Sequence, residues 1–344
     1  MNSVSIINPI NYKGWDDLLL TNDKTTFFHT AAWARVLHES YNYKPLYFTL
    51  IENSKLKILL PVMEIKSILT GSRGVSLPFT DHCPPIAENQ NAFNKIFNEV
   101  IRHGKKANWK AIEFRGGKEC LNSKSPSETF LTHALDISQS EQKIFSKFRS
   151  STKRNIKKAV KVGVQVKILN SLESIKEFYQ LNCLTRKAHG LPPQPFYFFK
   201  KLYEHVISKN KGFLALALNQ NKVIAGAVYF HLGSEAIYKY GASDKTYNHL
   251  RPNNLIMWEA IKRYQHNGFK RFNFGRTEPD HKGLLQFKRG WGTMEEPIHY
   301  YRYDLKTNDF LKNSYKVKSS YTFFKKMPLQ LLKLAGHIMY RHLG

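Results

Sequence analysis

The sequence predicts an α+β fold made of two similar halves with mixed, mainly antiparallel sheets, followed by a helical tail. The first observation is an internal repeat, because residues 101–117 align without a gap on residues 261–277, at an offset of 160. The second is the order of elements: each half has a helix, a strand hairpin, another helix and a short strand, which is typical of a mixed sheet. The third is composition, since 42% hydrophobic and 13% aromatic residues are enough for folded cores.

The first half is expected to begin with a helix over residues 31–40. Two strands, PLYFTLI and LKILLPVMEI, then form a hairpin around the turn ENSK. A helix over 91–106 and a strand over 110–115 complete this half. Both belong to the repeated segment, whose two copies share apolar positions such as Ile101 with Ile261.

The second half repeats this order. GFLALAL and VIAGAVYFHL flank the turn NQNK, and EAIYKYG is the next strand, with a break expected at Gly241 and Asp244. A helix over 253–266 and a strand over 271–275 follow. The chain of 344 residues exceeds one typical domain. The predicted boundaries are 1–135 for the first subdomain, 136–305 for the second, which carries most site residues, and 306–344 for the tail.

Charge and cysteine content restrict the partners and the compartment. The net charge of +27 implies anionic partners, namely nucleic acid, nucleotide or pyrophosphate ligands, or an acidic membrane surface. The alternative explanation of this charge is that the protein comes from a lineage whose proteins are generally Lys-rich. Three cysteines without a CxxC spacing favour reduced thiols in the cytoplasm. We find neither a signal-peptide pattern at the N-terminus nor a run of about 18 apolar residues.

The most informative stretch for function is 238–292. It places polar groups at strand ends and helix starts, where α/β folds expose backbone N–H groups and ligand-binding side chains. The stretch contains YGASD, the helix start PNN, NFGRT and the closing GLLQFKRGWG. No GxGxxG after a strand and no GxxxxGK[ST] occur, so Rossmann and P-loop chemistry are not supported.

These motifs, with FRSSTKRNIKKAVKVGVQV and SLPFTDHCPP upstream, resemble the Fem family of peptidoglycan-bridge aminoacyltransferases and their acetyltransferase-like relatives. The resemblance covers roughly residues 25–305. It implies two tandem acetyltransferase-like (GNAT-type) subdomains packed together. The long coiled-coil arm of the family is not matched, because no sustained heptads occur between 163 and 213, and this leaves the donor open. CoA acetyltransferases carry a Gly-rich pyrophosphate-binding loop at the place where this sequence has HLRPNN. This difference disfavours the usual way of binding acetyl-CoA.

Lys288 is the main catalytic candidate. It lies among Leu285, Phe287 and Trp291, so its side chain must snorkel or find a partner. The resemblance implies a lysine of this motif near the acyl carbonyl, where a fixed cation stabilises an oxyanion. The alternative is a structural ion pair.

Three other candidates follow, and the first two have structural alternatives. Arg276 suits a diphosphate or carboxylate, but acidic residues that follow it offer internal pairing. Asp244 could accept a proton from an amine and is equally a common turn residue. Arg186 precedes the Pro-rich turn GLPPQP, which would fix a rigid loop over a groove.

A basic helix is expected around residues 147–161, which hold seven Lys or Arg and no acid. It could neutralise phosphates, or it is a solvated charged face. The resemblance singles out Arg154 and Asn155 and favours a role in the groove between the subdomains. The positions expected on its apolar face are Ile144, Phe148, Ile156 and Val160.

The sequence thus predicts an acyltransferase that moves an aminoacyl or acyl group to an amine on a cell-envelope precursor, peptidoglycan or polysaccharide. The alternatives are a CoA-dependent N-acetyltransferase of a nucleotide sugar and a non-enzymatic RNA-binding module. No tightly bound cofactor and no metal are expected; aminoacyl-tRNA or acyl-CoA is the co-substrate. The catalytic candidates are Lys288, Asp244 and Tyr240, and the substrate- or phosphate-binding candidates are Arg276, Arg154, Asn155, Lys239, Asn253, Asn254 and Arg186.

The expected partners are an anionic precursor, lipid-linked or nucleotide-linked, tRNA, and an anionic membrane surface. The expected location is the cytoplasm, at the inner face of the membrane. Residues 306–344 carry eight Lys or Arg and one acidic residue, and the segment after Pro328 has the spacing of a short amphipathic helix. This pattern fits a helix on a membrane surface and a helix docked on the protein equally well.

Overall fold

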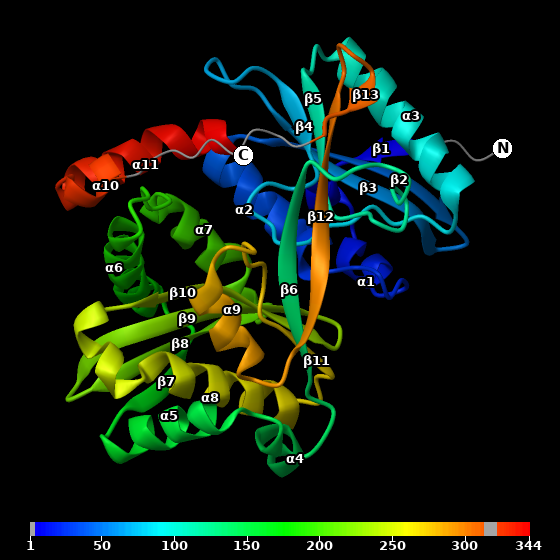
Figure 1. Cartoon of the computed structure of the whole chain (residues 1–344). Coiled ribbons are helices and arrows are strands. Elements are labelled where there is room, and N and C mark those ends of the chain that lie inside the picture. Colours follow the sequence, from blue (N-terminus) through cyan, green and yellow to red (C-terminus); the bar gives the residue numbers. More distant parts are fainter. Residues whose placement is uncertain (1–3, 313–321) are drawn as a thin grey trace. The chain divides into compact units, whose positions relative to one another are not determined.

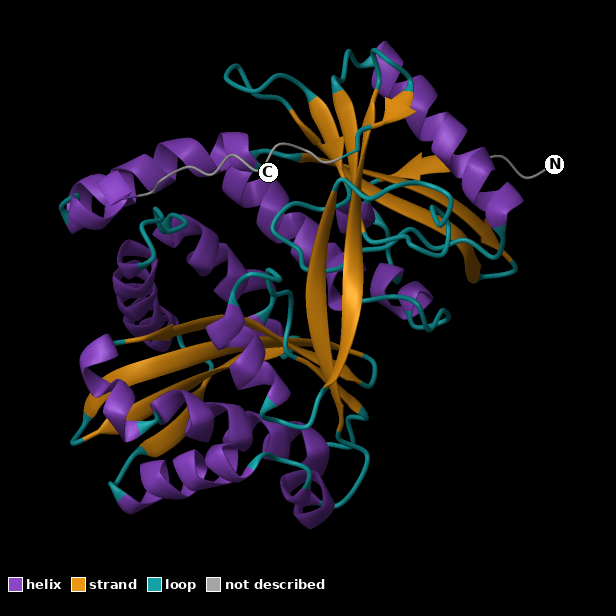
Figure 2. Cartoon of the chain, in the orientation of Figure 1, coloured by secondary structure: helices purple, strands orange, loops and turns teal. Residues whose placement is uncertain are grey.

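The computed structural model describes residues 4–312 and 322–344, and their contacts divide the chain into two α+β units. Unit 1 comprises Met1–Phe130, Pro297–Val317 and Met339–Gly344, and unit 2 comprises Leu131–Glu296 and Lys318–Ile338. In each unit, helices flank a mixed sheet (Figures 1 and 2). The predicted α+β class is confirmed.

The sheet of unit 1 has the strand order β1-β2-β3-β4-β5-β12, and β13 extends it beside β12. Among the described residues of this unit, the neighbours β4 and β5 run parallel, and the other strand pairs are antiparallel. The predicted hairpin is β2–β3. The strands are β1 (Ser5–Ile7), β2 (Lys44–Glu52), β3 (Lys55–Ile65), β4 (Arg73–Val75), β5 (Ala111–Arg115), β12 (Met294–Asp304) and β13 (Asp309–Phe310).

Helices cover both faces of the sheet of unit 1 because consecutive strand residues are buried, as in Pro45–Thr49 of β2. Phe48 packs in one cluster with Phe93 and Ile96 of α3, whereas the neighbouring Tyr47 meets the ring of Trp15, with centroids 5.6 Å apart. Successive strand residues thus serve opposite faces. The helices of this unit are α1 (Trp15–Leu19), α2 (Ala31–Tyr41) and α3 (Gln90–Lys106), with short 3-10 turns at Pro9–Asn11 and Phe27–His29.

His29 makes the stability of unit 1 sensitive to acid. Its buried ring accepts a hydrogen bond from the Thr26 N–H at Nδ1 (3.0 Å) and donates from Nε2 to the Pro84 carbonyl (3.0 Å). Burial lowers the pKa of His29 from 6.5 to about 4. The unfolded chain therefore takes up a proton near pH 6.5 that the folded chain does not.

We expect the free energy of unfolding to be fully present above pH 6.5 and to fall as the pH drops towards 4, by about 3 kcal/mol from this group. Chemical denaturation at a series of pH values measures the slope. His29→Gln cannot take up the proton, so it should remove part of the slope. An unchanged slope in this variant would contradict the assignment.

The sheet of unit 2 has the order β6-β11-β10-β9-β8-β7. Here only β10 and β11 run parallel, over Glu235–Ile237 and Arg271–Asn273. The strands are β6 (Glu128–Asp136), β7 (Gln165–Leu169), β8 (Gly212–Asn219), β9 (Lys222–Leu232), β10 (Glu235–Ser243) and β11 (Arg271–Asn273).

Helices lie on both faces of the unit 2 sheet (Figure 1). Ala215 and Ala217 belong to the cluster that α5 and α8 complete, whereas Leu216, between them, lies with Phe178 of α6 beside Gly226. The helices are α4 (Glu141–Ser146), α5 (Ser150–Lys161), α6 (Leu172–Ala188), α7 (Phe196–His205), α8 (Pro252–His266) and α9 (Lys282–Arg289), with 3-10 turns η3 (Ile207–Lys209) and η4 (Lys245–Leu250).

The two units repeat one topology, as the internal repeat predicts. In each, three antiparallel strands are followed by a parallel pair, β4–β5 or β10–β11, and a helix connects the pair. The offset of 160 holds where the repeat was found, since α3 ends at Lys106 and α8 at His266, and β5 starts at Ala111 and β11 at Arg271. The last strand of each sheet comes from the other half of the sequence: β12 joins unit 1 and β6 joins unit 2.

Two local expectations are wrong. The strand does not break at Gly241, because Gly241 pairs with Ala227 and β10 continues to Ser243; the irregularity is a bulge between Tyr238 and Tyr240. A Cβ at Gly241 would lie 1.7 Å from the Tyr238 hydroxyl, so glycine is needed there for space. Val160 is 59% exposed rather than inward, because α5 buries Thr152, Ile156 and Ala159 instead.

The chain ends with α10 (Thr322–Lys326) and α11 (Leu329–Leu343). The predicted tail helix is thus present. No helix within residues 4–312 and 322–344 has the length and apolar content needed to cross a membrane.

Candidate active site

Lys288 is a buried lysine on α9. The helix is amphipathic, is capped at its start by His281, whose Nδ1 accepts from the Leu284 N–H (3.2 Å), and buries only Leu285 and Lys288. Lys288 is 2% exposed, and its Nζ donates to the carbonyls of Gly275 (2.7 Å) and Arg276 (3.3 Å). The charge is therefore held by backbone dipoles at the exit of β11.

These two carbonyls are available because the chain bulges after β11. The Phe274 N–H donates to the His133 carbonyl (2.8 Å) and the Thr277 N–H to the Leu131 carbonyl (2.7 Å), so Gly275 and Arg276 together face only one residue of β6. Gly275 has φ +71°, a conformation that glycine adopts without strain. The bulge turns its carbonyls away from the strand ladder, and the Lys288 ammonium satisfies them.

The turn after α9 fixes the position of the lysine. Trp291 is fully buried, and its ring meets those of Phe148 (4.9 Å between centroids), Phe274 (6.1 Å) and Phe287 (5.9 Å). The Gly290 carbonyl accepts from the Arg149 N–H at the start of α5 (2.9 Å). The carboxyl end of α9 is thus locked to the α4–α5 junction.

A charged network lies next to Lys288. His133 of β6 is fully buried and its Nε2 donates to Glu295 (2.8 Å), which also accepts two hydrogen bonds from Arg289 (2.7 and 2.8 Å). Burial, and then the Lys288 charge, lower the pKa of His133. The His133 ring is therefore neutral at neutral pH, and its Nδ1 has no hydrogen-bond partner among the described residues.

An open pocket of about 530 Å³ adjoins the outer face of α9. Three cationic side chains, Arg149, Lys282 and Arg289, stand around it over apolar residues. Such a lining suits an anionic group attached to a partly apolar molecule. The remaining lining residues are Leu131, Pro279, Leu285 and Gln286.

The predicted residues at the end of β10 form a second group. Asp244 caps η4: its Oδ1 accepts from the N–H (3.0 Å) and hydroxyl (2.7 Å) of Thr246, and these bonds lower the pKa of Asp244. This is the turn role named above. Asn253 donates from its amide to the Ser243 hydroxyl (3.4 Å), and Asn254 is buried in the first turn of α8.

The other predicted residues lie on separate elements. Lys239 is the bulged residue of β10, and its ammonium lies 5.4 Å from the ring centroid of Tyr240, which packs on the aromatic residues of α7. Arg186 donates from Nε to the Pro192 carbonyl (3.2 Å), closing the loop after α6. Arg154 is exposed on α5 and Asn155 is half-buried there.

Residues 146–288 match the acetyltransferase (GNAT) domain family. The chain is 24% identical over 272 residues to the lipid II:glycine glycyltransferase of Staphylococcus haemolyticus (strain JCSC1435), with 58% of this chain and 64% of that protein covered. The chain is thus similar to the GNAT domain over residues 146–288 and to a Fem-type glycyltransferase over a longer stretch.

A protein of the same name from Staphylococcus epidermidis is 35% identical over 89 residues, which cover 24% of this chain and 21% of that one. The chain therefore spans less than two thirds of the length of these curated relatives. The crystal structure of FemX aligns with a TM-score of 0.70 at 15% identity and covers 85% of this chain and 95% of FemX. A tandem GNAT protein of the clavulanic acid pathway aligns at 0.54 and 7% identity, covering 89% and 99%. At these identities the likeness concerns the fold.

The chain has no Gly-rich loop between β10 and α8. The turn η4 occupies this place, followed by Arg251 in the left-handed region (φ +62°) and Pro252 at the first position of α8. The Asp244 carboxylate and Pro252 thus shape the turn before α8. In a Gly-rich loop, by contrast, the glycines let the backbone approach a diphosphate closely.

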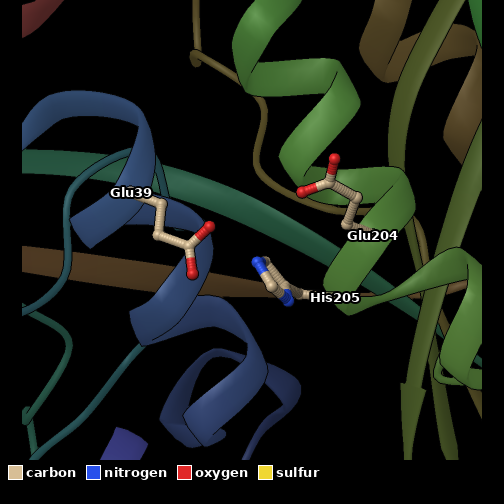
Figure 3. A group of neighbouring side chains, drawn as sticks. All are labelled: Glu39, Glu204 and His205. Atoms are coloured by element: carbon tan, nitrogen blue, oxygen red, sulfur yellow. The ribbon is translucent and has the colours of Figure 1, made fainter.

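We assign no metal site to the described residues. Figure 3 shows Glu204 and His205, adjacent on α7, and Glu39, which belongs to α2 of unit 1. Within unit 2 the pair offers two ligand groups, and Glu204 is engaged by Lys201 (2.8 Å) and Lys200 (3.9 Å). A structural zinc site takes four ligands.

The structure brings Lys288 and the backbone of Arg276 together, and it places the β10 group and the α5 residues on other elements. Sequence reasoning missed His133 and Glu295, which are 162 positions apart and carry no shared motif. It also missed Arg149, Lys282 and Arg289. The run of basic residues at 147–161 was a signal for Arg149, but nothing indicated that α9 supplies the other two.

Proposed function

We propose that this chain transfers an aminoacyl or acyl group to an amine of a cell-envelope precursor, with a peptidoglycan precursor as the preferred acceptor. The observation that carries this proposal is the buried Lys288 ammonium, fixed at the exit of β11 in a GNAT-type unit. The similarity to lipid II:glycine glycyltransferases supports the acceptor class. The proposed location is the cytoplasm.

In the proposed reaction the acceptor nitrogen attacks the acyl carbonyl carbon. The amide C–N bond forms, the bond from carbon to the donor's oxygen or sulfur breaks, and the amine proton ends on that leaving atom. Negative charge develops on the carbonyl oxygen in between. A preorganised cation in a water-poor site stabilises that charge, which is the role we give Lys288. Asp244 and Tyr240 are the weaker catalytic candidates. The Asp244 carboxylate accepts a hydrogen bond from the Thr246 hydroxyl, and its lowered pKa makes it a poor base.

We further propose that the α9 pocket, defined by the residues listed above, binds the phosphate of the acceptor or donor. Three cations from two helices converge there, and Arg149 and Arg289 have the planar fork that suits phosphate oxygens. Glu295 pairs with Arg289 on one side and so orients it. Arg154 and Asn155 on α5, Arg276, Arg186, Lys239, Asn253 and Asn254 remain proposed contacts.

The pocket predicts a defect in binding. Arg149→Glu with Lys282→Glu should raise KM about tenfold or more, leave kcat less affected, and weaken the dependence of kcat/KM on salt, because both substitutions remove attraction for an anion. Steady-state kinetics at several salt concentrations measure this. Lys157→Glu with Lys158→Glu is the matched control, since both lysines are exposed on α5 and the change in net charge is the same. Equal effects of the two double variants would refute the pocket.

One experiment tests the function as a whole. The full chain is incubated with a set of labelled aminoacyl-tRNAs or with acyl-CoAs, and with lipid II or its soluble nucleotide-linked counterpart as acceptor. Mass spectrometry of the acceptor should show one added aminoacyl or acyl group. We expect aminoacyl-tRNA to serve, because η4 replaces the Gly-rich loop. The GNAT match keeps acyl-CoA as the second candidate donor and a nucleotide sugar as its acceptor. Failure with every pair, together with tight RNA binding, would favour the RNA-binding alternative.

A further inference from the structure

The tail helix α11 is docked through only one of its faces. Within unit 2, Leu332 is fully buried, and the Lys333 ammonium lies 5.7 Å from the ring centroid of Tyr179 of α6. Gly336 packs so closely that a Cβ there would lie 2.0 Å from the Pro193 carbonyl oxygen. Within unit 1, the Tyr340 carbonyl accepts from the Tyr43 hydroxyl (2.8 Å). The docked positions recur every four residues, as one helical face requires.

The opposite face of α11 is apolar and exposed. Leu331, Leu334 and Ile338 are 54%, 55% and 52% exposed, and their spacing of three and four residues aligns them in one stripe. Phe323 of α10 is 72% exposed. We call Leu331, Leu334 and Ile338 the outer stripe of α11. An aliphatic row of this kind in water is a mark of an interaction surface.

Cations flank the outer stripe. Lys325 and Lys326 of α10 and Arg341 of α11 are exposed, and the sequence from 306 to 344 carries eight basic residues against one acidic residue. Positive charge around an apolar row complements an anionic lipid surface, where headgroups attract the cations and the boundary with the acyl chains takes up the aliphatic groups. A nucleic acid would meet the same charge but gains little from leucine and isoleucine, since it is bound through cations and aromatic stacking.

We propose that the outer stripe of α11 binds the surface of an anionic membrane while the inner face stays docked. The sequence left membrane binding and docking as alternatives; the geometry assigns one to each face. The inference is independent of the proposed acyl transfer, because it concerns lipid binding by a helix that none of the proposed site residues belongs to.

The test is flotation of the full chain with vesicles of phosphatidylglycerol and phosphatidylcholine in equal parts, and with vesicles of phosphatidylcholine alone. The wild-type chain should float with the anionic vesicles and much less with the neutral ones. L331S/L334S/I338S should lower the partition to anionic vesicles by about tenfold or more, since each side chain loses apolar area to bury. V160S/V162S is the control for loss of exposed apolar side chains, because Val160 and Val162 are 59% and 37% exposed at the end of α5 in the same unit and should not matter.

A charge variant keeps the proposal testable if the triple variant folds poorly, which circular dichroism would reveal. K325E/K326E keeps the stripe and should lower binding to anionic vesicles only, with a weaker salt dependence. Binding of either variant at the wild-type level, or no binding of the wild-type chain, would overturn the proposal. The proposal would also be overturned if the outer stripe held two copies of the chain together. Light scattering would then show a wild-type dimer and a monomeric triple variant, and neither protein would bind vesicles.

Discussion

Replacing Lys288 with methionine is expected to lower turnover by about 10²–10³-fold, the usual cost of losing one preorganised donor to an oxyanion. Methionine keeps most of the packing of the side chain and removes its charge. KM for the acceptor should change less, because the interaction is made mainly in the transition state. Single-turnover kinetics with the donor and acceptor that the transfer assay selects measure this effect.

The contacts of Lys288 also predict a moderate loss of stability in the same variant. Two buried carbonyls, of Gly275 and Arg276, lose their donor, and an unsatisfied buried group costs about 1–3 kcal/mol. Activity must therefore be compared well below the melting temperature and normalised to folded protein. Lys288→Ala leaves room for an added alkylammonium ion, which should restore part of the turnover. Full activity of Lys288→Met would move the site to Arg276 and its neighbours.

Local patterns predicted the helices and strands well because each carries its own signal. The helix expected at 91–106 is Gln90–Lys106, and the one at 253–266 is Pro252–His266, since apolar periodicity fixes their length and a capping Asn or a Pro fixes their start. The repeat between them predicted that both halves share a topology. The resemblance to the Fem family followed from the order of short motifs, none of which is decisive alone.

Features that depend on distant residues could not be predicted. Nothing in the sequence indicates that β12 completes the sheet of unit 1 and β6 that of unit 2, so the continuous ranges 1–135 and 136–305 stay a prediction beside the interleaved units. His133 meets Glu295 only in the folded unit 2, because 162 positions separate them in the sequence. A two-residue bulge at 275–276 likewise shows no signal beyond one glycine.

Lys288 has one feature that the local sequence predicts and another that depends on distant residues. Its apolar neighbours in the sequence predicted that the side chain must find a partner, and it does. The structural alternative expected a charged side chain as the partner, whereas the Lys288 ammonium donates to the backbone carbonyls of Gly275 and Arg276. Only the fold shows this, because the bulge that presents those carbonyls forms when β11 pairs with β6. The catalytic role of the lysine stays a prediction.

Replacing Trp291 with alanine is expected to destabilise the chain by about 3–5 kcal/mol, the usual cost of truncating a large buried aromatic residue. The indole is fully buried and joins α9 to Phe148, Phe274 and Phe287. For a unit of this size the loss corresponds to a fall in melting temperature of about 6–20 °C. Differential scanning calorimetry measures it.

The same substitution should also lower activity by more than the unfolded fraction explains, because Trp291 holds the end of the helix that positions Lys288. Trp291→Phe is the matched control. It retains an aromatic ring and removes an indole N–H that has no hydrogen-bond partner among the described residues, so its cost should stay below about 1.5 kcal/mol. If Trp291→Ala melts like the wild type, the turn after α9 is not what anchors the lysine, and the bulge at 275–276 must hold it alone.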